Sequence, residues 1–432
     1  MASANDVLSS VKLDTQGRRL FWPLVMTTLL FLLWGLSYGL LDVLNKHFQE
    51  ALNIDKAKST LLQFAYFGAY AVMSWPAGRL MERYGFKRTV LFGLGLYAFG
   101  AFLFIPSAVS QTFIAFLVSL FVLASGLCMI EATASPYVTL LGTPDGGDRR
   151  IKVAQCFFAT GAFIGPIIGG ALFFDLDPSD RSGLHTVELT YAAVGVGVLL
   201  FALIYSRIWM PEAKPVASSA VMPEASALPL LQQRHFLWAA VAQWLNVGAQ
   251  IGLGALFINF AVENWPGLTS ANGAYLLSVG MAMLLAGHIV STLLLRFMPS
   301  HLILTLFATL NIVLTVLIAL DIPRVSTIAL VISFFGCGGT YAYIFALGMR
   351  GLGANAKRGA AALVFGVSGG AIIPPIMGLI ADGFATHYSY LVLTPCYIVV
   401  ALFGWKFHRP KQVSANDDPA KAFRVLDKEP SL

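Results

Sequence analysis

Long apolar runs dominate the chain, and twelve of them are long enough to cross a hydrocarbon core of about 30 Å, which takes roughly 20 helical residues. They cover residues 21–47, 59–79, 88–107, 111–141, 152–174, 189–209, 235–263, 272–296, 301–320, 326–349, 359–383 and 388–407. Most of these runs do not alternate with a period of two, which excludes the strands of a membrane β-barrel. Because a helix satisfies its own backbone hydrogen bonds in lipid, the pattern predicts an all-α integral membrane protein with twelve transmembrane helices.

A polar stretch rich in Ala, Pro and Ser divides these spans into six and six. It reads PEAKPVASSAVMPEASALPLLQQR, residues 211–234, and its composition is typical of a flexible linker. We therefore expect a six-helix bundle at 21–210 and a second at 235–407. Segments 1–20 and 408–432 are polar and flank the bundles as an N-terminal segment and a tail.

The fifth and eleventh spans resemble each other. RRIKVAQCFFATGAFIGPIIGG, residues 149–170, and KRGAAALVFGVSGGAIIPPIMG, residues 357–378, are identical at eight of 22 positions without gaps. Parallel repeats related by an axis along the membrane normal are a known transporter plan, with the solute site at the midplane between them. Small residues there allow close helix packing. Pro166, Pro374 and Pro375 either fix kinks or belong to a moving gate.

Charge sets the orientation. Of the sequence, 57% is hydrophobic and 12% charged, whereas soluble domains carry about a quarter charged residues. The net charge of +6 does not indicate nucleic acid, because 23 of the 28 Lys and Arg fall on the side of the termini. The five on the opposite side are Lys46, Lys56, Lys58, Arg181 and Arg324. Positive charge marks cytoplasmic loops, so we expect a multi-pass protein of the plasma membrane, monomeric, with both termini cytoplasmic.

A compact charged motif follows the second span. It reads GRLMERYGFKR, residues 78–88, with Gly78 placed for close helix approach and Gly85 for a tight turn. Its charged residues after the first glycine are Arg79, Glu82, Arg83, Lys87 and Arg88. We expect Glu82 and the bases that follow it to form a network that opens and closes with the two halves. The motif resembles the loop signature of the major facilitator superfamily, and we assign Arg150 and Arg358, at equivalent repeat positions, to the same gating set.

A narrower resemblance extends from about Leu29 to Asp382. It is carried by LLFLLWG, LDVLN, LLQFAYFGAY, ASGLCMIEATASPYVTLLG, RRIKVAQ, AQWLNVGAQ and SGGAIIPPIMGLIAD. These segments resemble the L-fucose:proton symporter family, whose members carry fucose, glucose, galactose or amino sugars. The resemblance implies a small solute, a sugar or sugar derivative, moved by alternating access with protons as the coupling ion and no other cofactor.

Two acids lie within predicted spans, Asp42 in the first and Glu131 in the fourth. Intramembrane acids generally face an aqueous cavity and serve a function, because an ionised carboxylate in lipid is costly. Asp42 is alternatively a helix-end residue, and Glu131 alternatively holds a static hydrogen bond. Their axial separation is on the order of 10–20 Å, too far for direct proton exchange. The resemblance places both in proton coupling.

Several polar and aromatic residues are candidates for solute binding. Gln243, Asn246 and Gln250 are spaced by three and four, which puts them on one helix face. They either bind hydroxyls or hold helices together. The resemblance adds Trp34, Tyr38, Gln155 and Phe158, together with Glu131 itself. Trp34 can stack on a sugar ring or serve as a core residue. His288 is either titratable or a structural hydrogen-bonded residue.

Five positions depart from the fucose-carrier pattern. They are Leu41, Ser135, Lys152, Phe158 and Ala342, at sites where the family has mostly asparagine and, in the last case, proline. Loss of amides leaves a cavity less able to pair many hydroxyls, at about 1–3 kcal/mol for each unpaired buried group. These departures make fucose itself a poor fit to the cavity. The retained acids still favour proton coupling.

Three functional hypotheses stay open from the sequence. The first is a proton-coupled symporter of a monosaccharide or its derivative; the second is a proton-coupled transporter or exporter of a less polar metabolite; the third is a non-transporting sensor with the same fold. We find no nucleophile, metal cluster or phosphate loop, so we do not expect an enzyme or a metal site. The four cysteines fall in apolar spans without metal-ligand spacing and are expected to be packing residues.

Overall fold

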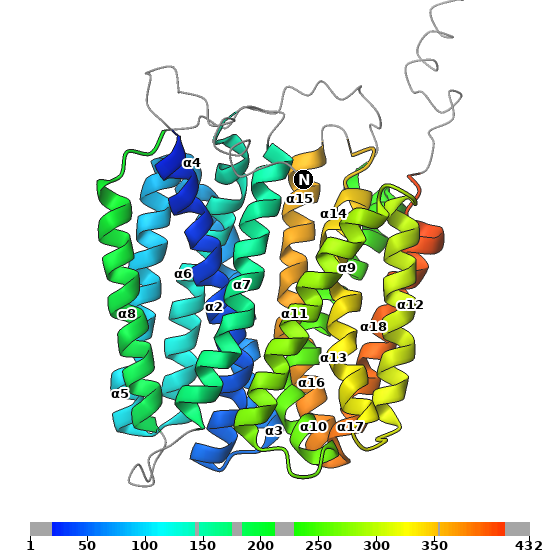
Figure 1. Cartoon of the computed structure of the whole chain (residues 1–432). Helices are drawn as coiled ribbons and strands as arrows, with labels where there is room; N and C mark the ends of the chain where they lie inside the picture. The colour runs from blue at the N-terminus through cyan, green and yellow to red at the C-terminus, as the bar shows by residue number, and fades with distance from the viewer. Residues whose placement is uncertain (1–19, 143–146, 175–183, 212–228, 353–354, 411–432) are drawn as a thin grey trace, which may run out of the picture.

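The computed structural model describes residues 20–142, 147–174, 184–211, 229–352 and 355–410. Within these ranges all regular secondary structure is helical, and the long helices run side by side through the thickness of the molecule (Figure 1). The predicted 1–20 segment, the linker 211–234 and the 408–432 tail lie largely outside the described residues.

The first half contains six long spans and two short helices. These are α2 (Phe21–Leu52), α3 (Lys56–Ser59), α4 (Leu61–Phe102), α5 (Phe104–Ser110), α6 (Phe113–Leu140), α7 (Gly147–Phe173) and α8 (Leu184–Arg207). The helix α4 covers two spans, since it is merged across a sharp backbone break at Gly85.

The second half is more broken. It contains η2 (Leu230–Gln232), α9 (Arg234–Ala255), α10 (Phe257–Asn264), α11 (Ser270–Leu294), α12 (Ser300–Ala319), α13 (Val325–Cys337), α14 (Thr340–Gly348), α15 (Ala356–Phe365), η4 (Gly366–Ser368), α16 (Gly369–Gly383), α17 (Thr386–Ser389), η5 (Tyr390–Val392), α18 (Leu393–Leu402) and the π-helical turn η6 (Phe403–Phe407).

The twelve predicted spans are present in the described residues. Ten helical segments are long and apolar enough to cross a membrane, and α9 with α10 forms an eleventh that is bent by 48°. One of the ten, residues 56–110, is folded back at Gly85 and crosses twice, which gives twelve. The predicted twelve-helix, all-α architecture is therefore confirmed.

Several predicted spans have different limits or are not single helices. The first extends to Leu52, five residues beyond the expected end at 47. The run 235–263 bends at Leu256, the run 326–349 breaks at Gly338 and Gly339, and the run 359–383 passes through the 3₁₀ turn η4. Hydropathy alone does not reveal such breaks, because an apolar run stays apolar across a bend.

The motif at residues 78–88 is not the open loop that its charges suggest. Helical structure continues into it from both sides, and Gly85 alone makes the turn with φ of 80° and ψ of 175°. A left-handed φ is costly for residues with a Cβ. Gly78, by contrast, faces open space, because no neighbouring atom lies within 4 Å of the point where a Cβ would stand. The expected close approach at Gly78 is therefore absent from this conformation.

Glycines bring α2 and α7 into backbone contact. A Cβ on Gly161 would collide with the carbonyl oxygen of Leu32 and lie 2.7 Å from the amide nitrogen of Leu36. Lipid provides no hydrophobic drive for helix association, so this close packing carries the association. It also places the side chains of α7 against those of α2.

We expect Gly161→Val to destabilise the first half, since the obstacle is backbone and cannot move aside. Overpacking of this kind costs about 1–3 kcal/mol, which corresponds to a Tm lower by roughly 2–10 °C. Thermal unfolding of the purified protein in detergent measures this. Gly197→Val is the matched control, because nothing lies within 4 Å of the corresponding position on α8; equal losses for both variants would contradict the packing argument.

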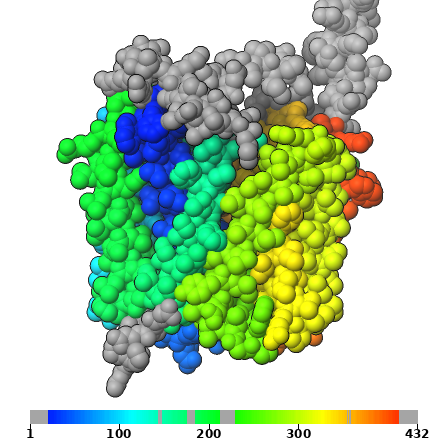
Figure 2. Space-filling model, in the orientation of Figure 1, coloured from blue at the N-terminus to red at the C-terminus, as the bar shows by residue number. Residues whose placement is uncertain are grey.

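The two halves touch at one end of the molecule. This end carries α3, α10 and α17 (Figure 1), and we call it the outer end because the charge pattern predicts it to be non-cytoplasmic. There α7 meets α11, where a Cβ on Gly170 would lie 3.1 Å from Cβ of Ala274. Figure 2 shows these helices meeting near the outer end and a hollow between the halves toward the opposite, inner end.

Candidate functional site

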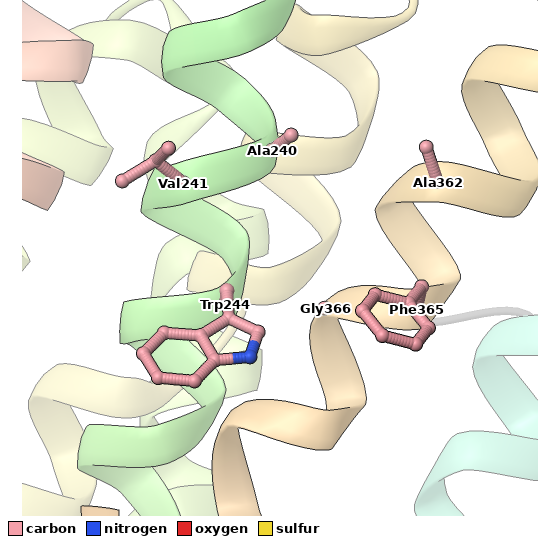
Figure 3. A pocket seen from close by; sticks show the side chains of 6 residues that line it. All are labelled: Ala240, Val241, Trp244, Ala362, Phe365 and Gly366. Atoms are coloured by element: carbon pink, nitrogen blue, oxygen red, sulfur yellow. The ribbon is translucent and has the colours of Figure 1, made fainter. Parts of the chain in front are cut away.

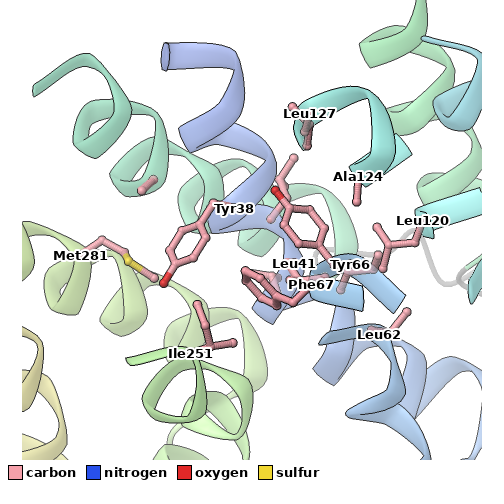
Figure 4. Packing of buried hydrophobic residues seen from close by; sticks show 14 of the residues in the cluster. Tyr38, Leu41, Leu62, Tyr66, Phe67, Leu120, Ala124, Leu127, Ile251 and Met281 are labelled. Atoms are coloured by element: carbon pink, nitrogen blue, oxygen red, sulfur yellow. The ribbon is translucent and has the colours of Figure 1, made fainter. Parts of the chain in front are cut away.

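An aromatic group from α2 and α7 lies at the junction of the two halves. The ring centroids of Trp34 and Phe158 are 4.2 Å apart, and those of Tyr38 and Phe158 are 5.6 Å apart. Figure 4 shows Tyr38 pointing from the first half toward Met281 and Ile251 of the second. The sequence-predicted Trp34, Tyr38 and Phe158 are thus brought together, and their role in solute binding stays a prediction.

Glu131 lies on α6 beside two tyrosines of α4. Its Oε2 atom is buried without a hydrogen-bond partner, as are the hydroxyls of Tyr66 and Tyr70. The rings of Tyr66 and Tyr70 stack with centroids 5.8 Å apart, and both hydroxyls interact electrostatically with the Glu131 carboxyl. Buried polar groups are almost always paired, so this cluster has hydrogen-bonding capacity to offer to a ligand or water.

The amides of α9 face the same region from the second half. Gln243 and Asn246 are fully buried, and both polar atoms of the Gln243 amide and Nδ2 of Asn246 lack a partner. The hydroxyl of Tyr341 on α14 interacts with both Gln243 and Glu131, although its geometry toward Gln243 is not that of a hydrogen bond. Tyr341 thus relates Gln243 of its own half to Glu131 of the other half.

The two remaining amides are placed differently. Gln250, one turn beyond Asn246, faces the hydroxyl of Tyr38, so it lies at the junction of the halves. Gln155 is half-buried on α7, one turn before Phe158. The candidate site thus draws on helices α2, α4, α6 and α7 of one half and on α9 and α14 of the other.

Asp42 lies in a separate polar network nearer the outer end. Gln63 Nε2 donates to its Oδ1 at 3.2 Å, and its Oδ2 rests against Gly254 of α9. The helix α2 continues for ten residues past Asp42, to Leu52. Asp42 is therefore an interior residue of its helix, not the helix-end residue considered as the alternative.

The same network joins the halves through amides. Asn45 Nδ2 donates to the carbonyl of Ala255 at 2.7 Å and to Gln63 Oε1 at 3.3 Å. Gln49 Nε2 donates to Asn45 Oδ1 at 3.2 Å, and Asn259 Nδ2 donates to Gln49 Oε1 at 2.5 Å. These buried bonds link α2 to the bend between α9 and α10.

Charged groups close the outer surface. Lys56 Nζ lies 2.6 Å from Glu263 Oε1 and donates to Thr386 Oγ1 at 2.7 Å. The carboxylate of Asp382 accepts from the backbone N–H groups of Lys56 and Ala57 at 3.2 and 2.7 Å. All three partners belong to the second half, so the outer end is shut by contacts between halves.

Comparison with known proteins identifies the family to which this architecture belongs. The family model described as Major Facilitator Superfamily matches residues 25–369. The chain belongs to the Major Facilitator Superfamily. A glucose/galactose transporter of Brucella abortus is 30% identical over 390 residues, covering 89% of this chain and 93% of the relative. The L-fucose-proton symporter of Escherichia coli is 31% identical over 410 residues, covering 90% and 94%.

Solved structures give the same result. The crystal structure of the superfamily transporter FucP in the outward conformation matches with a TM-score of 0.66 at 30% identity, covering 90% of this chain and 98% of that one. A bacterial homologue of the human lysosomal transporter Spinster, in an inward-facing and unoccupied conformation, matches with a TM-score of 0.70 at 15% identity, covering 90% and 97%; this second likeness shows the fold alone.

In this conformation the described residues of the charged motif show no ion pair between Glu82 and the bases that follow it, and its role in opening and closing the halves stays a prediction. Glu82 is exposed and has no ion pair among the described residues. Lys87 instead donates to the carbonyls of Ser206 and Ile208 at 2.7 and 2.8 Å. These carbonyls lie at the end of α8, where the helix leaves them without a backbone partner. Lys87 donates to them and not to the solvated carboxylate of Glu82.

The other predicted gating residues have varied surroundings. Arg150 donates to the carbonyls of Val138 and Thr139 at the end of α6, at 3.1 and 2.5 Å. Arg83 and Arg88 are exposed, as is Arg358 on α15, and the guanidinium of Arg83 lies 5.3 Å from the ring centroid of Tyr84. Arg150 thus ties α7 to α6 within one half.

His288 and the cysteines have structural surroundings. His288 Nδ1 lies 2.9 Å from the carbonyl of Leu284, one turn earlier. Cys128, Cys337 and Cys396 are buried, as expected of packing residues, whereas Cys156 is exposed on α7. The expectation of a packing role is therefore wrong for Cys156, because its side chain is exposed and not packed against other helices.

Sequence reasoning missed the tyrosines and the amide network. Asp42, Asn45 and Gln49 are spaced by three and four, the same spacing that singled out Gln243, Asn246 and Gln250. Ending the first predicted span at 47 concealed this pattern. Tyr66, Tyr70 and Tyr341 had no such signal, since tyrosine is common among packing residues of aromatic-rich spans.

Proposed function

We propose that the chain is a proton-coupled symporter that moves a monosaccharide or sugar derivative across the plasma membrane by alternating access. One observation carries the proposal. Buried hydrogen-bonding groups from both halves, on Glu131, Gln243 and Asn246, have no protein partner and lie at the same junction as the ring faces of Trp34 and Phe158. Ring faces and convergent donors and acceptors are what a polyol with apolar C–H faces requires.

The contacts of the outer end support alternating access. In this conformation Lys56, Asp382 and the Asn45 network hold the halves together at the outer end, while the hollow seen in Figure 2 separates them toward the inner end. Rocking of one half against the other around a midplane site is the general mechanism for such repeats. The predicted cytoplasmic termini make the present state inward-facing.

Protons are the coupling ion in this proposal, with no other cofactor. Asp42 is 6% exposed and its network contacts the second half, while Glu131 is shared with the proposed solute site. Burial penalises an ionised carboxylate, so each acid gains from taking up a proton. In this proposal protonation of Asp42 accompanies closure of the outer end, and protonation of Glu131 accompanies solute binding. The names of two relatives, an L-fucose-proton symporter and a glucose/galactose transporter, support a sugar as the solute.

Uptake into proteoliposomes tests the proposal. Purified protein is reconstituted and offered labelled glucose, galactose, fucose and apolar metabolites, with and without an inward proton gradient. Gradient-dependent accumulation of at least one sugar is the expected result. Binding of a sugar without any flux would favour a sensor and contradict the proposal.

A second candidate is a transporter of a less polar metabolite. It is favoured by Phe158 on the face of Trp34 and by buried Leu41, at positions where the fucose carriers have amides. In the same experiment this candidate predicts flux of an apolar solute, or efflux driven by an inward proton gradient, with no sugar uptake.

A further inference from the structure

The carboxyl of Asp42 lies directly against the backbone of Gly254 on α9, across the junction of the two halves. A Cβ on Gly254 would collide with Oδ2 of Asp42 and lie 2.9 Å from its Cγ. Real Cβ atoms essentially never come within 3.0 Å of such an atom. Any residue larger than glycine at position 254 therefore requires either the carboxyl or the helix to move.

The surroundings of α9 change from its own half to the other half along its length. In its first part Trp244 faces Phe365 of α15 across a gap within the second half (Figure 3). About two turns later, a Cβ on Gly252 would lie 2.6 Å from Sδ of Met377 on α16, which also belongs to the second half. At Gly254 the obstacle is a group of the first half. Gly254 is therefore placed to respond to movement between the halves, and Gly252 is not.

Hydrogen bonds next to this contact hold the Asp42 carboxyl in place. Gln63 Nε2 donates to Oδ1 of Asp42 at 3.2 Å, and Gln63 Oε1 accepts from Asn45 at 3.3 Å. Asn45 lies on the same face of α2 as Asp42 and donates to the carbonyl of Ala255, the residue after Gly254, at 2.7 Å. Rotation of the carboxyl away from a side chain at 254 would break the bond from Gln63.

The contact with Gly254 gives an ionised Asp42 no compensation. Asp42 is 6% exposed, and it has no ion pair among the residues that the structure describes. Gly254 has no side-chain donor, and its backbone N–H lies within the helical hydrogen-bond ladder of α9. Burial of an unpaired carboxylate is costly, whereas a protonated carboxyl is neutral. Closure of the outer end therefore favours the protonated form of Asp42.

The other titratable groups around Asp42 do not supply a competing charge. Tyr38 on its own helix and Tyr390 of η5 interact with it electrostatically, and a tyrosine hydroxyl ordinarily loses its proton only near pH 10. Lys46, one turn further along α2, pairs with Glu50 at 3.2 Å. A change in pH between about 5 and about 8 thus acts on this contact through Asp42 itself.

We propose that Gly254 is a positioning residue for proton coupling, because its bare backbone closes over Oδ2 of Asp42 and excludes the water that an ionised carboxylate needs. The outer end then closes over the protonated acid and not over the carboxylate. The inference rests on the proposed proton coupling. It gives Gly254 a role in closure, separate from solute binding.

Distances across the outer end measure this closure in the full-length, purified protein. Spin labels are placed at Thr112→Cys and Leu320→Cys, exposed outer-end positions of opposite halves, after replacement of the four native cysteines. Spectra are recorded without solute from about pH 5 to about pH 8, and the closed population should rise as the pH falls. Gly254→Ala should lower the ratio of closed to open molecules by roughly 5- to 150-fold, the range expected for an overpacked contact.

Three further variants assign the effect to the contact with Asp42. Gly252→Ala is the matched control, since the side chains of Met377 and Leu393 that it meets belong to its own half; it should keep the distances of the unsubstituted protein. Asp42→Ala should close at every pH. Combined with Gly254→Ala, it should restore closure, because the obstacle to the new methyl group is gone.

The outcomes decide the role of Gly254. Closure of Gly254→Ala at the level of the unsubstituted protein overturns the inference, as does equal opening by Gly252→Ala. Failure of Asp42→Ala to restore closure, or a pH dependence that survives in Asp42→Ala alone, also overturns it. Because the distances are recorded without solute, absence of sugar uptake in proteoliposomes would overturn the proposed function and leave this result standing.

Discussion

Replacing Glu131 by Gln should abolish gradient-driven accumulation while leaving solute exchange intact. An inward gradient of one pH unit corresponds to about 1.4 kcal/mol per proton, enough for about tenfold accumulation when one proton accompanies each solute. The glutamine keeps the size of the side chain and its hydrogen-bonding oxygen, but it cannot take up or release a proton. We therefore expect the accumulation ratio to fall from about ten to about one.

The surroundings of Glu131 explain why exchange should survive. Its carboxyl interacts electrostatically with Tyr66 and Tyr70 of its own half and with Tyr341 of the other, so we expect an amide at this position to find hydroxyls to pair with. Exchange of labelled for unlabelled solute across the membrane involves no net proton movement. The variant loses only the step in which the empty carrier, after it has released its proton, returns to the outer-open state.

Proteoliposomes distinguish these outcomes directly. Counterflow at equal pH on both sides reports exchange, and uptake under an inward gradient reports coupling. Glu188→Gln is the matched control, because Glu188 lies on α8 at the outer end and contacts His185 of its own helix. Undiminished accumulation by the Glu131 variant would exclude this residue from coupling. Loss of both accumulation and counterflow would indicate that Glu131 acts in solute binding and not specifically in coupling.

The fold was predictable because its determinants are local or periodic. Apolar runs of the right length identify the spans, and the repeat of Gly161 with Gly369 and Pro166 with Pro374 relates the fifth span to the eleventh. Gln243, Asn246 and Gln250 could be chosen because spacing alone places them on one face of a helix. None of these arguments requires knowledge of which helices are neighbours.

The parts of the site that the sequence did not reveal depend on contacts between residues that are far apart in the chain. Asn259 meets Gln49 across 210 positions of the chain, and the bend at Leu256 that makes this contact possible lies inside an uninterrupted apolar run. Tyr341 interacts electrostatically with Glu131 of the opposite half, and it does so from α14, which begins at Thr340 after α13 ends at Cys337. Lys87 donates to helix-end carbonyls that the sequence does not reveal, and the role expected for Glu82 in a network that opens and closes stays a prediction.

The amide network predicts a second large effect, on the conformational equilibrium. The bend between α9 and α10 interrupts the helical hydrogen-bond ladder, and Asn45 of the other half donates to the carbonyl of Ala255 at that point. Asn45→Leu keeps the volume but removes this bond and two bonds within its own half, those with Gln63 and Gln49. Each buried polar group left unpaired costs about 1–3 kcal/mol.

The outer-closed state should therefore be disfavoured by about 1–3 kcal/mol, a change of roughly 5- to 150-fold in the population ratio, because only the bond to Ala255 crosses between the halves. In the outer-open state water can reach the carbonyl of Ala255, so this penalty applies to closure alone. We expect gradient-driven uptake to fall at least about fivefold, because each cycle must pass through the closed state.

Distances across the outer end test this prediction. Spin labels at Thr112→Cys and Leu320→Cys, both exposed outer-end positions in opposite halves, are measured after replacement of the four native cysteines. Asn45→Leu should shift the distance distribution toward longer values. Ser59→Ala is the matched control, since it removes a buried 2.8 Å bond from Gln49 that stays within one half and should lower stability without opening the outer end. Identical distributions for the two variants would show that Asn45 only stabilises its own half, and closure would then depend on Lys56 and Asp382 at the surface, where solvent makes such contacts weaker.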